Sequence, residues 1–161
     1  MNMKKVIDIS WLSAFTFFML LTLSSCLEAG LDELESYNDA EIRGFKFEHR
    51  WEQTINGGNN TQLGVVSLPT NVKIEGNTVY CTITVPEAGN PSFFTEEVRN
   101  NVKLEKIVGI ATISTASTIY LLEGAPALGK WGDFSKVSKY KVVAADGKTT
   151  KEWIIQCTLI K

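Results

Sequence analysis

Histidine is nearly absent from this chain: its 161 residues include only one, His49, together with three cysteines and four prolines. Zinc sites usually combine several histidine or cysteine ligands, and a hydrolytic triad needs its histidine in an open site. His49 lies between Phe47 and Trp51 on the apolar side of an alternating segment, so we interpret it as a core residue. We therefore expect no metal site, no cofactor and no enzymatic activity.

An excess of positive charge is also missing. The chain has 16 basic and 18 acidic side chains, which is not the strongly basic balance of a nucleic-acid-binding domain. The charge is unevenly placed, because residues 27–41 carry six acidic side chains and no basic one. We predict an acidic tether over residues 26–41, followed by a weakly basic domain over residues 42–161.

A long apolar run is missing too, because the one from Trp11 to Leu23 is too short for a comfortable helical membrane span of about 20 residues. The apolar run from Trp11 to Leu23 follows Lys4 and Lys5 and ends in small residues before a cysteine. A positive start, a short apolar middle and a small-residue end are the layout of an export signal. The sequence therefore predicts a signal peptide over residues 1–25.

The end of this signal, Leu23-Ser24-Ser25-Cys26, resembles the lipobox of bacterial lipoproteins. The resemblance implies lipidation of Cys26, cleavage just before it, and attachment to a membrane through the acyl chains. The acidic residues that follow resemble a signal for export to the outer face of an outer membrane, although the periplasmic face stays open. The alternatives are a plain secretory signal and an uncleaved anchor.

Beyond the tether, apolar and polar residues alternate with a period of two, which is typical of half-buried strands. The pattern is clear from Phe45 to Trp51 and from Thr78 to Val85, and Asp146-Gly147 joins the last two strands as a hairpin turn. Further strands are expected at residues 72–74, 104–113 and 118–122, with loops at residues 56–60, 86–100 and 124–132. No long helix is expected, so the fold class is all-β: an antiparallel β-sandwich, with a small barrel as the alternative.

Two cysteines remain in the domain. Cys81 and Cys157 both fall on apolar faces of predicted strands, and outside the cytoplasm such a pair can oxidise to a disulfide. Two separate buried thiols are the alternative, because the sequence does not show whether their Cα atoms lie within about 7 Å.

The C-terminal residues carry a second resemblance. Trp131-Gly132-Asp133-Phe134-Ser135, the segment 140–147, and Trp153-Ile154-Ile155 are similar to the last hairpin of bacterial immunoglobulin-like domains. Such domains recur in surface lipoproteins of gut commensals, many of them in families known only as domains of unknown function. The resemblance implies an immunoglobulin-like sandwich at the cell surface, often beside glycan-uptake machinery, and it transfers no catalytic residue.

Large aromatic residues in two predicted loops are the candidate binding residues. Trp131 stands between Gly129 and Gly132, where its ring could stack on a sugar, and Phe93 and Phe94 are weaker candidates. The alternative is that Trp131 and Phe134 fold back to cap the sandwich. We expect a surface-anchored module that binds an extracellular ligand, in particular a glycan. A structural or accessory lipoprotein that packs against an outer-membrane uptake complex or fimbria-like assembly is the other hypothesis.

Overall fold

The structure is a computed structural model that describes residues 37–55, 58 and 60–161. The predicted signal peptide, Cys26 and most of the predicted tether lie outside the described residues. No described helix is long and apolar enough to cross a membrane. The elements, in chain order, are β1 (Ile42–Ile55), β2 (Asn60–Leu68), β3 (Thr70–Glu75), β4 (Thr78–Thr84), α2 (Glu96–Asn100), the 3-10 helix η2 (Leu104–Lys106), β5 (Ile107–Ile113), β6 (Thr118–Leu122), β7 (Trp131–Gly132), β8 (Ser138–Val143) and β9 (Thr150–Ile160).

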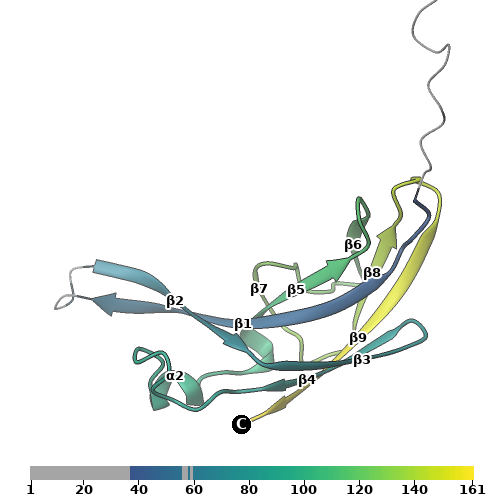
Figure 1. Ribbon diagram of the computed structural model, residues 1–161. Helices are drawn as coiled ribbons and strands as arrows, with labels where there is room; N and C mark the ends of the chain where they lie inside the picture. The colour runs from purple at the N-terminus through teal and green to yellow at the C-terminus, as the bar shows by residue number, and fades with distance from the viewer. Residues whose placement is uncertain (1–36, 56–57, 59) are drawn as a thin grey trace, which may run out of the picture. The chain divides into compact units, whose positions relative to one another are not determined.

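The strands form two sheets, and the predicted all-β sandwich is confirmed (Figure 1). The four-stranded sheet has the order β2-β1-β5-β7, and the five-stranded sheet has the order β3-β4-β9-β8-β6. Neighbouring strands are antiparallel except β4 and β9, which run parallel. The parallel pair joins the predicted β3–β4 hairpin to the predicted β8–β9 hairpin in one sheet.

The core between the sheets is aromatic, and its largest members come from the predicted alternating segments. Phe45 and Phe47 of β1 are almost fully buried and stack with ring centroids 5.5 Å apart. Phe134 meets Phe47 edge-on at 5.2 Å, and Tyr140 of β8 lies 6.3 Å from Phe45. Trp153 of β9 is also buried. Side chains of this size account for much of the apolar area that the fold removes from water.

The first strand is long, and its two halves have different neighbours. Residues 42–48 pair with β5, whereas residues 47–55 pair with β2, so the β1–β2 ribbon continues beyond the end of β5 (Figure 1). The connection after β4, which contains α2, packs against the inward face of this ribbon through Phe93 and Phe94. Thr95 caps α2 by accepting a hydrogen bond from the Val98 amide, at 3.3 Å.

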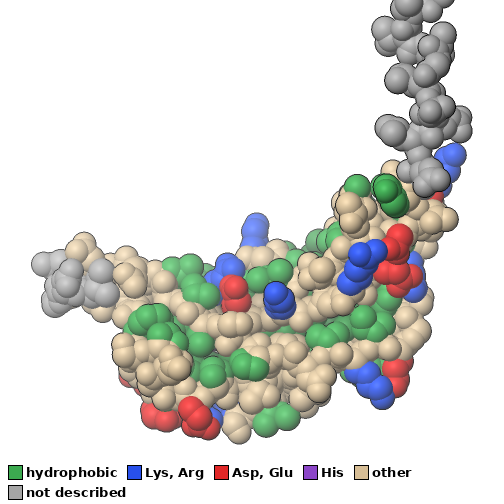
Figure 2. Space-filling model, viewed as in Figure 1, with side chains coloured by type: hydrophobic (Ala, Val, Ile, Leu, Met, Phe, Trp, Pro, Cys, Tyr) green, Lys and Arg blue, Asp and Glu red, His purple; other side chains and the backbone are tan. Residues whose placement is uncertain are grey.

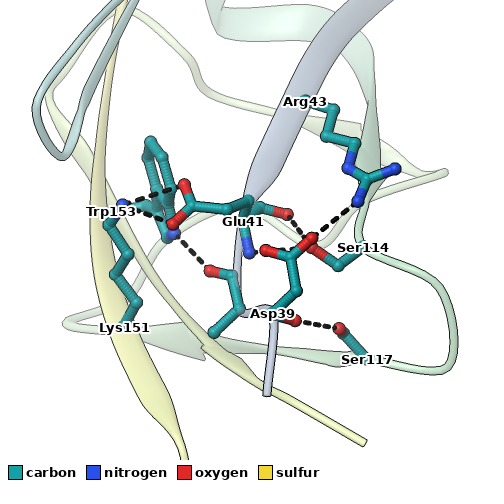
Figure 3. A network of polar contacts seen from close by, with 8 residues as sticks. Asp39, Glu41, Arg43, Ser114, Ser117, Lys151 and Trp153 are labelled. Carbon is teal, nitrogen blue, oxygen red and sulfur yellow. Dashed lines mark hydrogen bonds and ion pairs between the residues drawn. The ribbon is translucent and has the colours of Figure 1, made fainter. Parts of the chain in front are cut away.

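A network of polar contacts fixes the start of β1 to both sheets (Figure 3). Glu41 pairs with Lys151 of β9 at 2.7 Å, and its amide donates to the Ser114 hydroxyl at 2.9 Å. The Ser117 hydroxyl donates to the Asp39 carbonyl at 2.9 Å, and the Trp153 indole donates to the Ala40 carbonyl at 3.0 Å. The β5–β6 connection and β9 therefore both bind residues 39–41, which lead into β1.

Candidate functional site

Trp131 lies at the outer edge of the four-stranded sheet and is open to solvent. It belongs to the two-residue strand β7, where it pairs with Val108 of β5. Its side chain is 47% exposed. The indole nitrogen donates to the backbone carbonyl of Arg50 at 3.3 Å, and Lys106 Nζ lies 5.3 Å from the ring centroid. A hydrogen bond and a cation–π contact therefore fix the ring while leaving much of it accessible.

The loop that carries Trp131 is itself tied to the core. The buried Tyr140 hydroxyl donates to the Pro126 carbonyl at 2.7 Å, and burial raises the pKa of Tyr140 above its ordinary value. A side chain at Gly132 would collide with Pro126. Gly129 has a positive φ of 76° and donates its amide to the Gly109 carbonyl at 2.9 Å. The loop is therefore held in one conformation.

A shallow hollow of about 330 Å³ opens beside this ring, and we call it the Trp131 hollow. Its lining combines apolar and cationic side chains: Arg50, Leu63, Val108, Gly129, Lys130 and Trp131. Figure 2 shows hydrophobic side chains exposed along the β1–β2 ribbon with basic side chains among them.

Arg50 organises one wall of the Trp131 hollow. Its guanidinium group bonds Glu48 through two nitrogens, at 3.0 and 2.8 Å, and donates to the Gly129 carbonyl at 3.1 Å. Arg50 thus links the outward face of β1 to the loop before Trp131. A planar apolar surface with hydrogen-bonding groups at its edge suits a ring that has an apolar face and polar rim, as a sugar does.

The structure separates the three aromatic residues that the sequence grouped as binding candidates. Phe94 is fully buried, so its assignment as a binding residue is wrong, because the ring packs against Trp51 at 5.9 Å and has no open face. Phe93 is 37% exposed and contacts Trp51 on the inward face of β1. Trp131 lines the same hollow as Arg50, whose side chain points to the outward face of β1, so Phe93 and Trp131 belong to different surfaces.

The alternative for Trp131 and Phe134 was that both fold back to cap the sandwich, and the structure shows this for Phe134 only. Phe134 is 1% exposed and lies against Gly109, where a side chain would collide with its ring. Trp131 remains exposed. Arg50, Leu63 and Lys106 were missed as site residues, since they come from β1, β2 and the 3-10 helix η2, and nothing local in the sequence shows that these elements meet beside Trp131.

The two domain cysteines lie side by side. Cys81 and Cys157 are directly opposite in the parallel β4–β9 pair, and both are free thiols. The pKa of Cys81 is lowered because the Cys157 thiol donates a hydrogen bond to it. The same contact, together with burial, raises the pKa of Cys157. The structure therefore brings together the pair that the sequence proposed as a possible disulfide.

Three acidic side chains of the connections, Glu87, Glu123 and Asp133, have separate partners. Glu87 lies 3.8 Å from Arg99, Glu123 pairs with Lys139 at 2.9 Å, and Asp133 accepts from the amide of Ser135 at 2.9 Å. Among the described residues, no group of three or more histidine, cysteine, aspartate or glutamate side chains is placed to hold a metal ion.

Comparisons with known proteins place this sandwich in a family of unknown function. The DUF5018-related family matches residues 42–156, so the chain belongs to that family. A crystal structure of a "putative secreted protein" from Bacteroides fragilis is similar over 78% of this chain and 99% of its own, with 31% sequence identity and a TM-score of 0.69. No curated protein matches the chain.

A second solved structure, a "putative glycoside hydrolase" from Bacteroides thetaiotaomicron, matches with 16% identity and a TM-score of 0.46. The similarity covers 82% of this chain and 28% of the other.

Proposed function

We propose that this protein is a lipid-anchored module of the outer cell surface that binds an extracellular glycan without catalysis. The observation that carries the proposal is the exposed indole of Trp131, held rigid at the rim of a hollow. A ring fixed before the ligand arrives loses little conformational entropy on binding. The secreted character given to the similar Bacteroides fragilis protein supports a location outside the cytoplasm.

Replacing Trp131 with alanine is expected to weaken retention on the bound glycan by about tenfold or more, because aromatic anchors dominate binding free energy. Affinity electrophoresis of the full chain through a panel of immobilised neutral and acidic polysaccharides measures this. Tyr120→Ala is the matched control, since Tyr120 is 49% exposed and also has a lysine, Lys141, over its ring at 5.7 Å. Equal retention of the Trp131→Ala variant and its parent would remove this residue from the site.

The anchor is tested separately. Mass spectrometry of the processed chain is expected to show that residues 1–25 have been removed and that the new N-terminal residue, Cys26, carries a diacylglycerol on its sulfur. Cys26→Ser is expected to block this processing and release the protein from the membrane fraction. An unmodified Cys26 thiol in the mature chain contradicts the lipoprotein assignment and leaves glycan binding to be judged on its own.

The structural alternative has its own supporting observation. β2 is one of the two edge strands of the four-stranded sheet, and it exposes Leu63 and Val65 at 53% and 39%. An exposed strand edge with apolar side chains can pair with another chain. Under this second proposal the domain packs against an outer-membrane uptake complex or a fimbria-like assembly. Failure of the parent protein to bind any polysaccharide in the panel would favour it.

A further inference from the structure

A second hollow lies on the inward face of the distal half of β1, and we call it the β1–α2 hollow. It measures about 480 Å³, and the lining residues that matter here are His49, Trp51, Gln53, Phe93 and Glu97. His49, Trp51 and Gln53 alternate with Arg50, which lines the Trp131 hollow. Because successive side chains of a strand point to opposite faces, the two hollows are separate sites.

The wall of the β1–α2 hollow is aromatic and tightly supported. The Trp51 indole lies over Gly64 of β2, where any side chain would collide with it. The ring stacks on His49 at 5.6 Å with an interplanar angle of 16°, and Phe93 lies 6.0 Å from it at 42°. Phe93 is partly exposed at the rim. This arrangement offers a firm apolar surface to a ligand.

Two buried polar atoms in the lining have no hydrogen-bond partner among the described residues: His49 Nδ1 and Gln53 Oε1. His49 is only 4% exposed. Burial lowers its pKa, so the ring is neutral at pH 7, and a hydrogen bond to the backbone of Lys106 engages its other nitrogen. Nδ1 therefore presents a lone pair. Buried acceptors are nearly always satisfied in native proteins, so these two call for a donor that the described chain does not supply.

The positions of these acceptors define the ligand. They flank Trp51 on the same face of one strand, four residues apart, which corresponds to about 13 Å at 3.3 Å per residue. A ligand that satisfies both must be extended, carry hydroxyl or amide donors, and have an apolar face for the indole. Glu97 in the lining disfavours an anion. A strand-like peptide would pair with backbone groups at a sheet edge, whereas these acceptors are side chains on a sheet face.

We propose that the β1–α2 hollow is a second carbohydrate site, which takes a neutral oligosaccharide across Trp51 and accepts hydrogen bonds from its hydroxyl groups at His49 Nδ1 and Gln53 Oε1. The site goes beyond the proposed function of the Trp131 hollow and does not depend on it. Two sites on opposite faces of β1 would let one domain hold a single polysaccharide at two places, which increases its apparent affinity.

The test uses His49→Phe and Gln53→Leu, which keep the approximate side-chain shape and remove the acceptors. The probes are maltotriose, cellotriose, mannotriose and xylotriose, titrated into the full chain by calorimetry. At least one is expected to bind, and each variant is expected to weaken that binding about tenfold, the loss typical of one strong hydrogen bond. The thermal midpoint of Gln53→Leu should stay the same or rise, because a buried unpaired acceptor has been removed. His49→Phe also removes the hydrogen bond to the Lys106 backbone, so this variant is judged by trisaccharide binding alone.

A direct readout does not depend on variants. His49 is the only histidine, so in an untagged chain its ¹⁵N imidazole signals need no further assignment. The Nδ1 resonance is expected to be that of an unprotonated acceptor and to shift when the bound trisaccharide is added.

The outcomes separate the two sites. Undiminished trisaccharide binding in both variants, no binding of any trisaccharide, a fall in the thermal midpoint of Gln53→Leu, or capture of a peptide in place of a sugar would each overturn the second site. None of these outcomes changes the prediction for Trp131→Ala on polysaccharides. That variant is expected to leave trisaccharide binding in the β1–α2 hollow unchanged, so the failure of one proposal is distinguishable from the failure of the other.

Discussion

Replacing Trp153 with alanine is expected to lower the free energy of unfolding by about 4 kcal/mol, the range found for truncating large buried aromatics. The side chain is 1% exposed and its indole nitrogen donates to the Ala40 carbonyl at 3.0 Å. Lys151 Nζ lies 4.2 Å from the ring centroid and also pairs with Glu41 (Figure 3). The substitution therefore removes core volume and detaches the start of β1 from β9. Urea unfolding followed by circular dichroism measures the loss.

Two control variants separate the contribution of the core volume from that of the hydrogen bond to Ala40. Trp153→Phe keeps most of the volume but leaves the Ala40 carbonyl without its donor, so a loss of about 1–3 kcal/mol is expected. Trp131→Ala removes an indole of the same size from a half-exposed position and is expected to cost less than either core variant. A loss below about 2 kcal/mol for Trp153→Ala would show that the ring is not needed to hold the two sheets together.

Oxidation of the Cys81–Cys157 pair is expected to stabilise the protein by about 4 kcal/mol, because the bond would close a loop of many tens of residues in the unfolded chain. The two residues are opposite each other in the β4–β9 pair, and a disulfide requires such neighbouring positions. A secreted environment supplies oxidising conditions. Unfolding the protein with and without a thiol reductant measures the difference.

Peptide mass spectrometry under non-reducing conditions is expected to find the two cysteine-containing segments joined. The double variant Cys81→Ala, Cys157→Ala should unfold at the same urea concentration with and without reductant. Two thiols that react freely in the unfolded, unreduced chain would contradict the bridge and leave the pair as the free thiols of the structure. In that case, both side chains act as small hydrophobic residues, and the raised pKa of Cys157 keeps it protonated at neutral pH.

The two strands with the clearest pattern in the sequence, β1 and β4, share one property: a single buried face. Phe45, Phe47 and His49 alternate with exposed or half-exposed residues in β1, and Val79, Cys81 and Ile83 do the same in β4. The Asp146-Gly147 turn fixed the last hairpin, in which Gly147 has a positive φ of 66°. Local patterns of this kind are visible in a sequence because they need no information about distant neighbours.

What the sequence could not show depends on contacts between distant residues. β2 was missed because Gly64 interrupts its pattern, yet that glycine is present because the Trp51 ring occupies the space above it. The parallel β4–β9 pairing joins segments more than 70 positions apart. Phe93 and Phe94 are adjacent and look equivalent in the sequence, but one is at a rim and the other in the core. Both hollows likewise combine residues from elements that are distant in the sequence.

The position of β1 also determines how the domain would respond to a mechanical load. The described chain enters the sandwich through this strand, which is flanked by β5 along its first half and by β2 along its second. A pull applied ahead of Ile42 acts along the strand, across ladder bonds that lie perpendicular to it. Those bonds would have to shear together, and the polar contacts of Asp39 and Glu41 would have to break with them. We therefore expect high resistance to force at this end.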